Sequence, residues 1–365
     1  MNDANALNFS GGPGALPASV LRQLQQAIQA LPETGLSVLG MSHRSPWFRA
    51  VLDEAEENLR LLLQVPADMR LLFLQGGGSL QFSMLPMNFL RGRSGPADYI
   101  VSGYWSAKAP IEAAKEGNVR IVWDGRPEGC HRLPAPDELR LSPDAAYLHY
   151  ASNETVEGLQ FQNIPRQAGV PLFCDMSSDL LSAPVDLSHY DAIYAHAQKN
   201  LGPAGVTLVI LRDGLMQTAT DDLPSLLDYR RHAEARSLYN TPPVFAIYAL
   251  LLVTRWLKDE IGGLPAMAAI NDAKARLLYG CLDATPGLYR GWAEPSARSK
   301  MNAAFTLPSP ALEAAFLAEA KAAGFHGLEG HRSLGGVRVS LYNAVSVQAV
   351  RQLTDWMAGF ARRHG

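Results

Sequence analysis

The chain has few cysteines, no long apolar run and no block of positive charge. Its three cysteines, Cys130, Cys174 and Cys281, share no close spacing, which excludes a disulfide framework and a cysteine-rich zinc site. No apolar run reaches the roughly 20 residues that span a bilayer, and residues 1–8 lack a basic stretch followed by an apolar one. We therefore expect a protein of the reducing cytoplasm that is neither membrane-bound nor secreted and that holds no metal.

The charge of the chain is close to balanced. Its 32 lysines and arginines against 35 aspartates and glutamates give a formal net charge of −3. No basic stretch could follow a phosphate backbone, so nucleic acid is not an expected partner. The 47% hydrophobic and 18% charged residues are typical of a packed protein. Because 365 residues exceed the usual size of one core, we expect a large domain and a smaller one.

Short apolar runs alternate with helical or glycine-rich segments through most of the chain. Apolar residues at helical spacing predict helices over 16–31 and 46–63, the second beginning at Ser45-Pro46. The seven runs that predict strands are 71–74, 99–101, 119–123, 145–150, 171–174, 191–194 and 206–211. Repeated strand–helix units of this kind predict an α/β domain with a mainly parallel seven-stranded sheet flanked by helices.

One pair of these strands differs from the others. Only about ten residues, with two glycines and a proline, separate the run that ends at Tyr194 from the run that begins at Val206, and parallel neighbours need a longer crossover. We therefore predict an antiparallel hairpin here, which makes one strand of the sheet antiparallel.

The chain after Gly262-Gly263 has a different pattern of elements. Helices are predicted over 267–282 and 311–322 and at the end of the chain, and strands over 302–307 and 337–342. We predict a large domain of residues 16–260 and a smaller α+β domain made of 1–15 and 261–365. Side chains alternate along the last strand, so Arg338 is expected to point away from the core that Val337 and Val339 face.

The residues that follow the predicted strands carry most of the chemistry in this sequence. Ligands of open α/β sheets bind beyond the carboxyl ends of the strands, where this chain has Gly76-Gly77-Gly78-Ser79, Trp105, Asn153-Glu154-Thr155, Asp175 and Lys199. Each feature also has an ordinary structural explanation: a tight turn, a packed ring, a helix cap, a capped turn or a solvated lysine. In the short hairpin, however, partial desolvation would lower the pKa of Lys199 and favour its neutral amine.

Pyridoxal phosphate is a ligand whose groups match this set of residues. Its phosphate needs N–H donors such as those of a glycine-rich helix start, and its ring needs a flat stacking face. Its pyridine nitrogen needs a carboxylate, and its aldehyde needs a lysine amine. Together the five features therefore favour a site for this cofactor.

Matching segments along nearly the whole chain carry a family resemblance. They are Asn8-Phe9-Ser10-Gly11-Gly12-Pro13, Ser42-His43-Arg44, Gly76-Gly77-Gly78 with Gln81-Phe82, Ala97-Asp98-Tyr99 with Gly103-Tyr104-Trp105, Asn153-Glu154-Thr155, the segment 197–205, Asn240-Thr241-Pro242-Pro243, Gly330-His331-Arg332, Gly335-Gly336-Val337-Arg338 and Ser340-Leu341-Tyr342-Asn343-Ala344. The chain resembles the phosphoserine aminotransferase family, a part of the class V, fold-type I group of pyridoxal phosphate-dependent enzymes.

The resemblance implies a role for each residue of the cofactor site. Lys199 would form a Schiff base with the cofactor and move the proton at the substrate Cα, and Asp175 would pair with the pyridine nitrogen. Trp105 would stack on the ring, and Thr155 would hydrogen-bond the phenolic oxygen. The residues implied to hold the phosphate are Gly78, Ser79, Gln198 and, from a second subunit, Asn240 and Thr241. A homodimer with shared active sites is therefore expected.

The resemblance also implies the substrates. Arg338 would bind the α-carboxylate, and the phosphate of phosphoserine or the side-chain carboxylate of glutamate would be bound by His43, Arg44, His331 and Arg332. From the residues alone, a solvated loop and a surface turn explain these two His-Arg pairs better. The implied reaction exchanges an amino group between glutamate and 3-phosphohydroxypyruvate, giving O-phospho-L-serine and 2-oxoglutarate by a ping-pong course in serine biosynthesis. Family members also act on 4-phosphohydroxy-L-threonine in pyridoxine biosynthesis.

One position departs from the family pattern, and other functions stay open. Many members have an arginine directly after the glycine triplet, where this chain has Ser79, so less positive charge is expected around the cofactor phosphate. Alternatives are another class V enzyme, namely an alanine–glyoxylate aminotransferase or a cysteine desulfurase, and a protein that only binds a phosphorylated metabolite. A desulfurase is disfavoured because Cys130 and Cys281 lie outside the matched segments and Cys174 lies within a strand.

Overall fold

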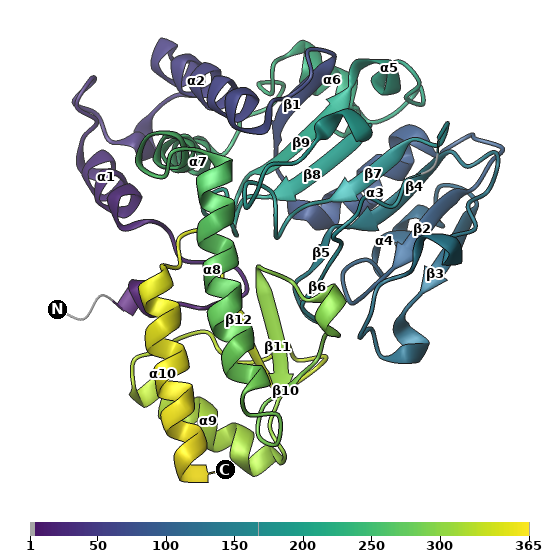
Figure 1. Ribbon diagram of the computed structural model, residues 1–365. Coiled ribbons are helices and arrows are strands. Elements are labelled where there is room, and N and C mark those ends of the chain that lie inside the picture. Colours follow the sequence, from purple (N-terminus) through teal and green to yellow (C-terminus); the bar gives the residue numbers. More distant parts are fainter. Residues whose placement is uncertain (1–3, 167, 365) are drawn as a thin grey trace.

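Seven strands form the central sheet of the computed structural model, which describes residues 4–166 and 168–364. Residues 1–3, 167 and 365 lie outside the described residues, so the parts of the predicted domains that include them are not compared with the structure. Across the sheet the strands have the order β1-β9-β8-β7-β4-β2-β3 (Figure 1). Their bounds are β1 Met69–Leu74, β2 Ala97–Val101, β3 Val119–Asp124, β4 Tyr147–Ala151, β7 Leu172–Asp175, β8 Ala192–His196 and β9 Thr207–Arg212. Strand β9 is antiparallel to both of its neighbours and every other pair is parallel, which confirms the predicted sheet.

The predicted hairpin between β8 and β9 is also confirmed. His196 pairs with Thr207 in antiparallel register, so the connecting segment 197–206 begins and ends at the same edge of the sheet. At that edge lie the carboxyl ends of β7 and β8. Lys199 is therefore brought to the end of the sheet at which the parallel strands finish.

Helices cover both faces of the central sheet. One face packs against α1 (Ala18–Gln29), α2 (Pro46–Leu63) and α7 (Val244–Arg255), and the other against α3 (Gly77–Phe89), α4 (Ala109–Ala113) and α6 (Tyr229–Glu234). Alternation along each strand divides the side chains between these layers; on β8, Ile193 belongs to the first and Tyr194 to the second. The short helix α5 (Asp213–Met216) follows β9.

Helix α2 shows how local sequence sets these bounds. The Ser45 hydroxyl accepts the Phe48 N–H at 3.2 Å, and Pro46 occupies the first turn, where its missing N–H costs nothing. The helix ends at Leu63, because the next residue, Gln64, has a left-handed backbone with a φ of 49° that stops the helical repeat. Its apolar stripe, including Phe48, Val51 and Leu59, is buried.

A second hydrophobic core lies in the part of the chain that follows. It is built on the antiparallel strands β10 (Arg290–Gly291), β11 (Asn302–Thr306) and β12 (Val337–Ser340), with α8 (Leu264–Asp283), α9 (Pro310–Ala322) and α10 (Val347–His364). Helix α8 runs from the region of the central sheet down to this second sheet (Figure 1). On β12, Val337 and Val339 are buried while Arg338 is only half-buried, as alternation predicts. The domain boundary near residue 260 stays a prediction.

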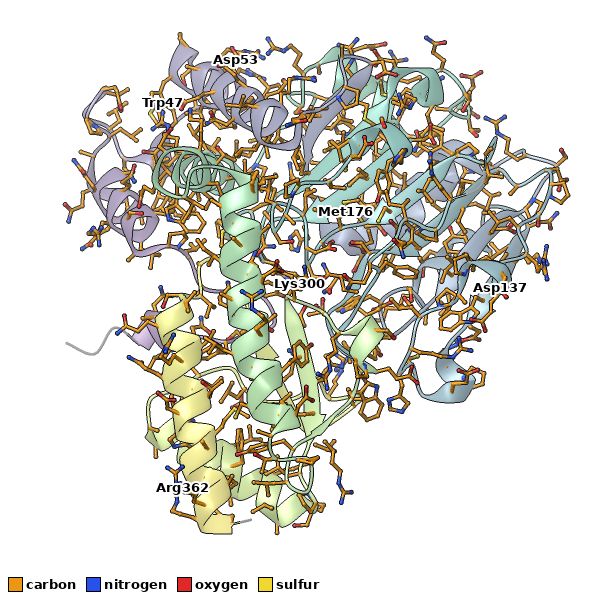
Figure 2. All side chains as sticks on the ribbon, viewed as in Figure 1. Trp47, Asp53, Asp137, Met176, Lys300 and Arg362 are labelled. Atoms are coloured by element: carbon orange, nitrogen blue, oxygen red, sulfur yellow. The ribbon has the colours of Figure 1, made fainter. Side chains whose placement is uncertain are left out.

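The carboxyl end of the central sheet faces this second part. Figure 2 shows Met176, which directly follows β7, between the sheet and Lys300 beside α8. Lys300 is tied to α8 by an ion pair of its Nζ with Asp272 at 2.6 Å. The small hairpin of β5 (Asn153–Glu154) and β6 (Leu159–Gln160) was not predicted, because two-residue strands carry no period. Within the described ranges, no helix is both long and apolar enough to cross a membrane.

Candidate active site

A cavity of about 610 Å³ opens at the carboxyl end of the central sheet, and it brings together most of the predicted site residues. Segments from seven separate parts of the sequence line it. The predicted residues among its lining are Gly78, Ser79, Trp105, Thr155, Asp175, Gln198, Lys199, His331 and Arg338. Strand ends that are far apart in sequence therefore converge as the α/β fold requires.

Lys199 lies in the hairpin between β8 and β9 and reaches into the cavity. Its Nζ donates a hydrogen bond of 2.6 Å to Thr155 Oγ1, which directly follows β5. Burial lowers the pKa of Lys199 to about 8, an effect that the negative charge of Asp175 reduces and the positive charge of Arg338 reinforces. An amine with this pKa is partly neutral near pH 7, as a nucleophile or base must be.

Asp175 ends β7 on the floor of the cavity and is 9% exposed. Its Oδ1 accepts the Ser177 N–H at 2.8 Å, so the carboxylate does cap the following turn, as the structural explanation proposed. Burial raises the pKa of Asp175, while the Ser177 hydrogen bonds and Lys199 oppose that shift. A buried carboxylate on the floor of a cavity fits a cation that enters the cavity.

The glycine triplet shapes the start of α3. Gly76 has a φ of 91° and Gly77 of 69°, backbone conformations that side chains other than glycine rarely adopt. The turn they form places Gly78 and Ser79 in the first turn of α3, where N–H groups have no partner within the helix. This end of the helix carries partial positive charge and fits a phosphate group.

Aromatic and basic side chains gather beside Trp105. The Tyr104 ring lies 4.6 Å from the His331 ring, and the Lys108 Nζ lies 4.3 Å from the Tyr104 ring centroid and 4.7 Å from that of Trp105. Hydrogen bonding to Lys108, and to a smaller extent to Arg332, lowers the pKa of Tyr104. Arg332 therefore lies close to His331 beside the cavity, although it is exposed and not part of the lining.

Arg338 extends from β12 over the amino-terminal segment. A Cβ on Gly11 would overlap the guanidinium in its present position, so glycine at position 11 lets the Arg338 side chain lie against this segment. The Arg338 Nε is buried and has no hydrogen-bond partner among the described residues. Burial lowers the pKa of Arg338 from its ordinary value of 12.5, and the group stays a cation. A half-buried guanidinium whose Nε has no partner among the described residues, and which lines a cavity, fits a carboxylate ligand.

Besides Arg332, four predicted residues do not line the cavity of their own chain. They are His43, Arg44, Asn240 and Thr241. Arg44 is exposed in the loop before α2, and the Thr241 carbonyl accepts a hydrogen bond from Gln75 Nε2 at 2.7 Å. Their assignment therefore stays a prediction.

Several lining residues were not predicted as site residues. They include Gly11, Gly12, Phe82, Asn153, Ser177, Ser178 and His196. Asn153 donates from Nδ2 to Ser178 Oγ at 2.8 Å and to Asn302 Oδ1 at 2.9 Å, and so ties the cavity wall to β11. Each of these seven residues either lies close in sequence to a predicted site residue or belongs to one of the matched segments. This proximity in the sequence is the signal that could have indicated their place in the site.

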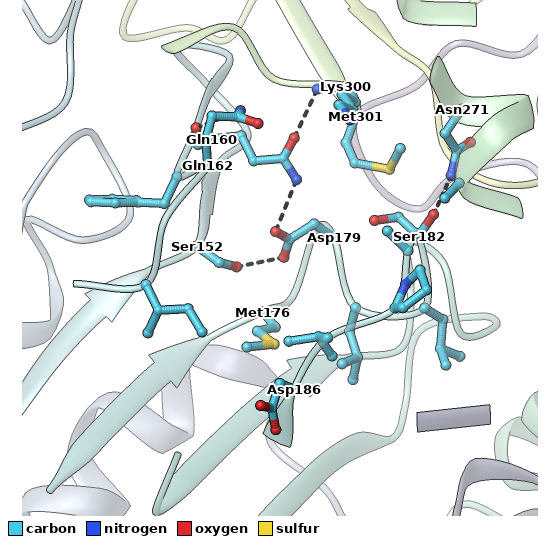
Figure 3. Close-up of a pocket in the computed structure, with 18 of the residues that line it drawn as sticks. Ser152, Gln160, Gln162, Met176, Asp179, Ser182, Asp186, Asn271, Lys300 and Met301 are labelled. Atoms are coloured by element: carbon cyan, nitrogen blue, oxygen red, sulfur yellow. Dashed lines mark hydrogen bonds between the residues drawn. The ribbon is translucent and has the colours of Figure 1, made fainter. Parts of the chain in front are cut away.

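A second pocket of about 330 Å³ lies behind Met176 and contains none of the predicted site residues. Figure 3 shows Asp179 in it, accepting hydrogen bonds from Ser152 Oγ at 2.6 Å and from Gln160 Nε2 at 3.2 Å. Burial raises the pKa of Asp179 to about 6. These bonds hold the segment after β7 in place. Lys300 also lines this pocket, but the described residues around it include no glycine-rich helix start that could bind a phosphate.

The cavity fits pyridoxal phosphate by the chemistry of its donor set. It offers a partly neutral lysine, a buried carboxylate, the first turn of α3, a tryptophan face and an unpaired arginine. In fold and site, the chain is thus a pyridoxal phosphate-dependent transferase.

Comparison with known proteins makes the assignment specific. The sequence model described as aminotransferase class-V matches residues 6–353, so the chain belongs to the class V aminotransferase family, whose members use pyridoxal phosphate. The chain is 49% identical to a phosphoserine aminotransferase of Laribacter hongkongensis, over 98% of this chain and 99% of that relative. Among solved structures, phosphoserine aminotransferase from Bacillus circulans subsp. alkalophilus has a TM-score of 0.95 at 43% identity, with 98% of each chain covered. The pyridoxal phosphate-bound phosphoserine aminotransferase of Trichomonas vaginalis has a TM-score of 0.91 at 37% identity, covering 96% of this chain and 99% of that one.

Proposed function

We propose that this protein is a phosphoserine aminotransferase. It transfers the amino group of glutamate to 3-phosphohydroxypyruvate, giving O-phospho-L-serine and 2-oxoglutarate for serine biosynthesis. The observation that carries this proposal is the meeting of Lys199, Asp175 and Arg338 in one cavity, in a chain almost half identical to phosphoserine aminotransferases. Bound pyridoxal phosphate supplies an electron sink that stabilises negative charge at the substrate Cα.

The residues of the central sheet would hold the cofactor and move the proton. Asp175 would keep the pyridine nitrogen protonated, Trp105 would cover one face of the ring, and Thr155 would hydrogen-bond the phenolic oxygen. The N–H groups of Gly78 and Ser79, with Gln198, would bind the phosphate. The Lys199 amine would take the proton from the substrate Cα and return it to the cofactor side; with a pKa of about 8 it can both accept and release a proton near neutral pH.

Basic residues would bind the two acidic ends of the substrate. Arg338 would bind the α-carboxylate through its planar guanidinium. His331 and Arg332, beside Trp105, would bind the distal phosphate or carboxylate, together with His43 and Arg44 of a second subunit. The 4-phosphohydroxy-L-threonine of pyridoxine biosynthesis carries the same acidic groups at its two ends, so we propose it as a further substrate of these residues.

A homodimer would complete the site. His43, Arg44, Asn240 and Thr241 lie outside the cavity of their own chain, which is the arrangement expected if they serve a partner. Leu36 and Leu39, shortly before His43, are 58% and 64% exposed, and such apolar exposure supports burial between subunits. We place this dimer in the cytoplasm.

The cysteines give no support to a desulfurase. Cys174 is buried within β7, Cys130 packs with Leu159 and Ala297, and the Cys281 thiol faces the Thr354 carbonyl in the second core. None of the three lines the cavity, whereas a desulfurase needs a thiol that reaches the cofactor.

A half-reaction tests the proposed function. Phosphoserine, alanine and cysteine are added separately to the purified protein, and the visible absorbance of the bound cofactor is followed. We expect phosphoserine to bleach this absorbance at concentrations at which alanine and cysteine do not. Bleaching by alanine would favour an alanine–glyoxylate aminotransferase, and a colourless protein would favour a metabolite-binding protein without catalysis.

A further inference from the structure

Two buried glutamates lie directly beneath the segment that carries Trp105. Glu154 belongs to β5 and is 1% exposed, and Glu157 lies in the turn between β5 and β6 and is 7% exposed. Carboxylates are rarely buried to this degree unless charges or several hydrogen bonds compensate them. The proposed mechanism uses neither of them, so their burial needs an explanation.

The two carboxylates bind the N–H groups of three successive residues. Glu157 Oε1 accepts the Tyr104 N–H at 2.9 Å. Glu154 Oε2 accepts the Trp105 N–H at 3.1 Å, and Glu154 Oε1 accepts the Ser106 N–H at 2.9 Å. A side chain at position 103 would prevent this approach, because a Cβ on Gly103 would lie 2.5 Å from Glu157 Oε2.

We propose that Glu154 and Glu157 are positioning residues, which together fix the backbone of residues 104–106 so that the Trp105 ring forms one wall of the cofactor cavity. Within the segment, the Ser106 hydroxyl accepts the N–H groups of Ser102 and Gly103, and turn hydrogen bonds join the Ala107 and Lys108 N–H groups to the Gly103 and Trp105 carbonyls. The two glutamates differ from these local bonds because they tie the backbone N–H groups of 104–106 to another element, the hairpin of β5 and β6. Hydrogen bonds to a charged acceptor are stronger than neutral ones and hold a loop more firmly. The inference rests on the proposed function only in taking Trp105 to contact the cofactor.

The pair is expected to carry one negative charge at neutral pH. Burial, and then the charge of Glu154, raise the pKa of Glu157 to about 8, whereas Arg338 opposes this shift. Glu154 accepts two N–H groups and is the better site for the charge; burial and the nearby Asp175 still raise its pKa. Two further titratable neighbours are Lys199, whose pKa the charge of Glu154 raises against the effect of burial, and Cys130, whose thiol stays neutral because burial and both glutamates raise its pKa.

Glu157 is also close enough to Arg338, the residue proposed to bind the α-carboxylate, for the charge of each to shift the pKa of the other. Glu157 Oε2 and Arg338 Nε are both buried, and neither has a hydrogen-bond partner within the part of the chain that is described. When Glu157 loses its proton, it adds a negative charge next to the guanidinium. That charge opposes the binding of the substrate carboxylate, so the KM for glutamate is expected to rise above pH 8 more than kcat changes.

Two variants of the same chemical type separate these roles. Glu154→Gln has one carbonyl where Glu154 uses two oxygens, so one of the Trp105 and Ser106 N–H groups loses its acceptor. Glu157→Gln keeps an oxygen for the Tyr104 N–H and places an amide group where the protonated oxygen lies. Asp186→Asn is the control, since the Asp186 carboxylate also accepts a backbone N–H, from Ser188 at 2.9 Å, outside this cavity.

Amide hydrogen exchange of the holoenzyme measures the position of the segment directly. We expect Glu154→Gln to speed exchange in the peptide that contains residues 104–106 by about tenfold or more at pH 7, and to alter the circular dichroism of the bound cofactor. Glu157→Gln and Asp186→Asn should exchange there like the wild type at pH 7. In Glu157→Gln the rise of the glutamate KM above pH 8 should disappear.

Wild-type exchange and wild-type circular dichroism in Glu154→Gln would overturn the positioning role. If Glu154→Gln does not fold, the pH profile of Glu157→Gln still decides: an unchanged rise of KM above pH 8 would overturn the coupling of Glu157 to Arg338 and with it the pair. Because hydrogen exchange needs no substrate, a failed half-reaction with phosphoserine would contradict the proposed function and leave this result standing.

Discussion

The Lys199 amine and the Thr155 hydroxyl lie 2.6 Å apart, although 44 residues separate them in the sequence. The hairpin between β8 and β9 supplies the amine, and the end of the small β5 strand supplies the hydroxyl. The hydrogen bond aims the amine at the point where Asp175, Trp105 and the first turn of α3 also converge. The reactive nitrogen is thus oriented by the protein before any ligand arrives, which lowers the cost of ordering it later.

Replacing this amine should abolish both colour and turnover. Lys199→Ala removes the proposed attachment point of the cofactor and the proposed base at the substrate Cα, so we expect activity to fall by at least about a thousandfold. Visible absorbance and steady-state rates measure the two losses. Lys300→Ala is the matched control, since its lysine is paired with Asp272 outside the cavity. Full activity in Lys199→Ala would refute the assignment.

The pH dependence of cofactor capture should report the pKa of Lys199. Only the neutral amine attacks an aldehyde, so the capture rate of cofactor-free protein should rise with pH and level off above about 8. Thr155→Val removes the acceptor that favours the ammonium form, and the levelling point should move to lower pH. Stopped-flow absorbance measures both profiles. A wild-type profile that levels off near 10 would mean that Lys199 is not desolvated as described.

The central sheet and Lys199 were predictable because both depend on local patterns. Seven apolar runs and one short connection predict the sheet and its antiparallel strand, and the carboxyl ends of parallel strands must meet. The direction of Arg338 follows from strand alternation in the same way.

The support beneath the cavity could not be predicted in this way. Glu154 and Glu157 read as ordinary polar residues of a loop, because their burial depends on a hairpin of two-residue strands and on Gly103, distant in sequence. Asp179 and Asn153 are similar cases, since their hydrogen-bond partners come from other elements. Residues whose role is set by tertiary burial leave no periodic signal in the sequence.

Two arginines should affect substrate binding differently. Arg338→Lys keeps the charge but loses the planar pair of donors, so we expect the KM for both glutamate and phosphoserine to rise about tenfold. Arg44→Ala removes only the contact proposed with the distal acidic group, and should raise the KM for phosphoserine while leaving the visible spectrum of the cofactor unchanged. Steady-state kinetics with each amino donor measures both effects. An unchanged KM for phosphoserine in Arg44→Ala would place the phosphate site elsewhere.

The buried carboxylate of Asp179 should make stability depend on pH in a defined direction. Its pKa rises from an ordinary 3.8 to about 6 on folding, so the folded state binds more protons than the unfolded state between these values. Stability contributed by this group is therefore highest below about pH 4 and is lost as the pH rises to about 6, a change of about 3 kcal/mol at most. Asp179→Asn removes this dependence of stability on pH. Its amide group would face Gln160 Nε2, which now donates a hydrogen bond to the Asp179 carboxylate, so the variant should be less stable than the wild type at pH 5. We expect the difference in the free energy of unfolding between the wild type and Asp179→Asn to shrink between pH 5 and pH 7, as measured by urea unfolding.

Asp186→Asn serves as a control of opposite sign, because the Ser188 hydrogen bonds lower the pKa of Asp186. A difference between the wild type and Asp179→Asn that grows with pH would contradict the raised pKa of Asp179.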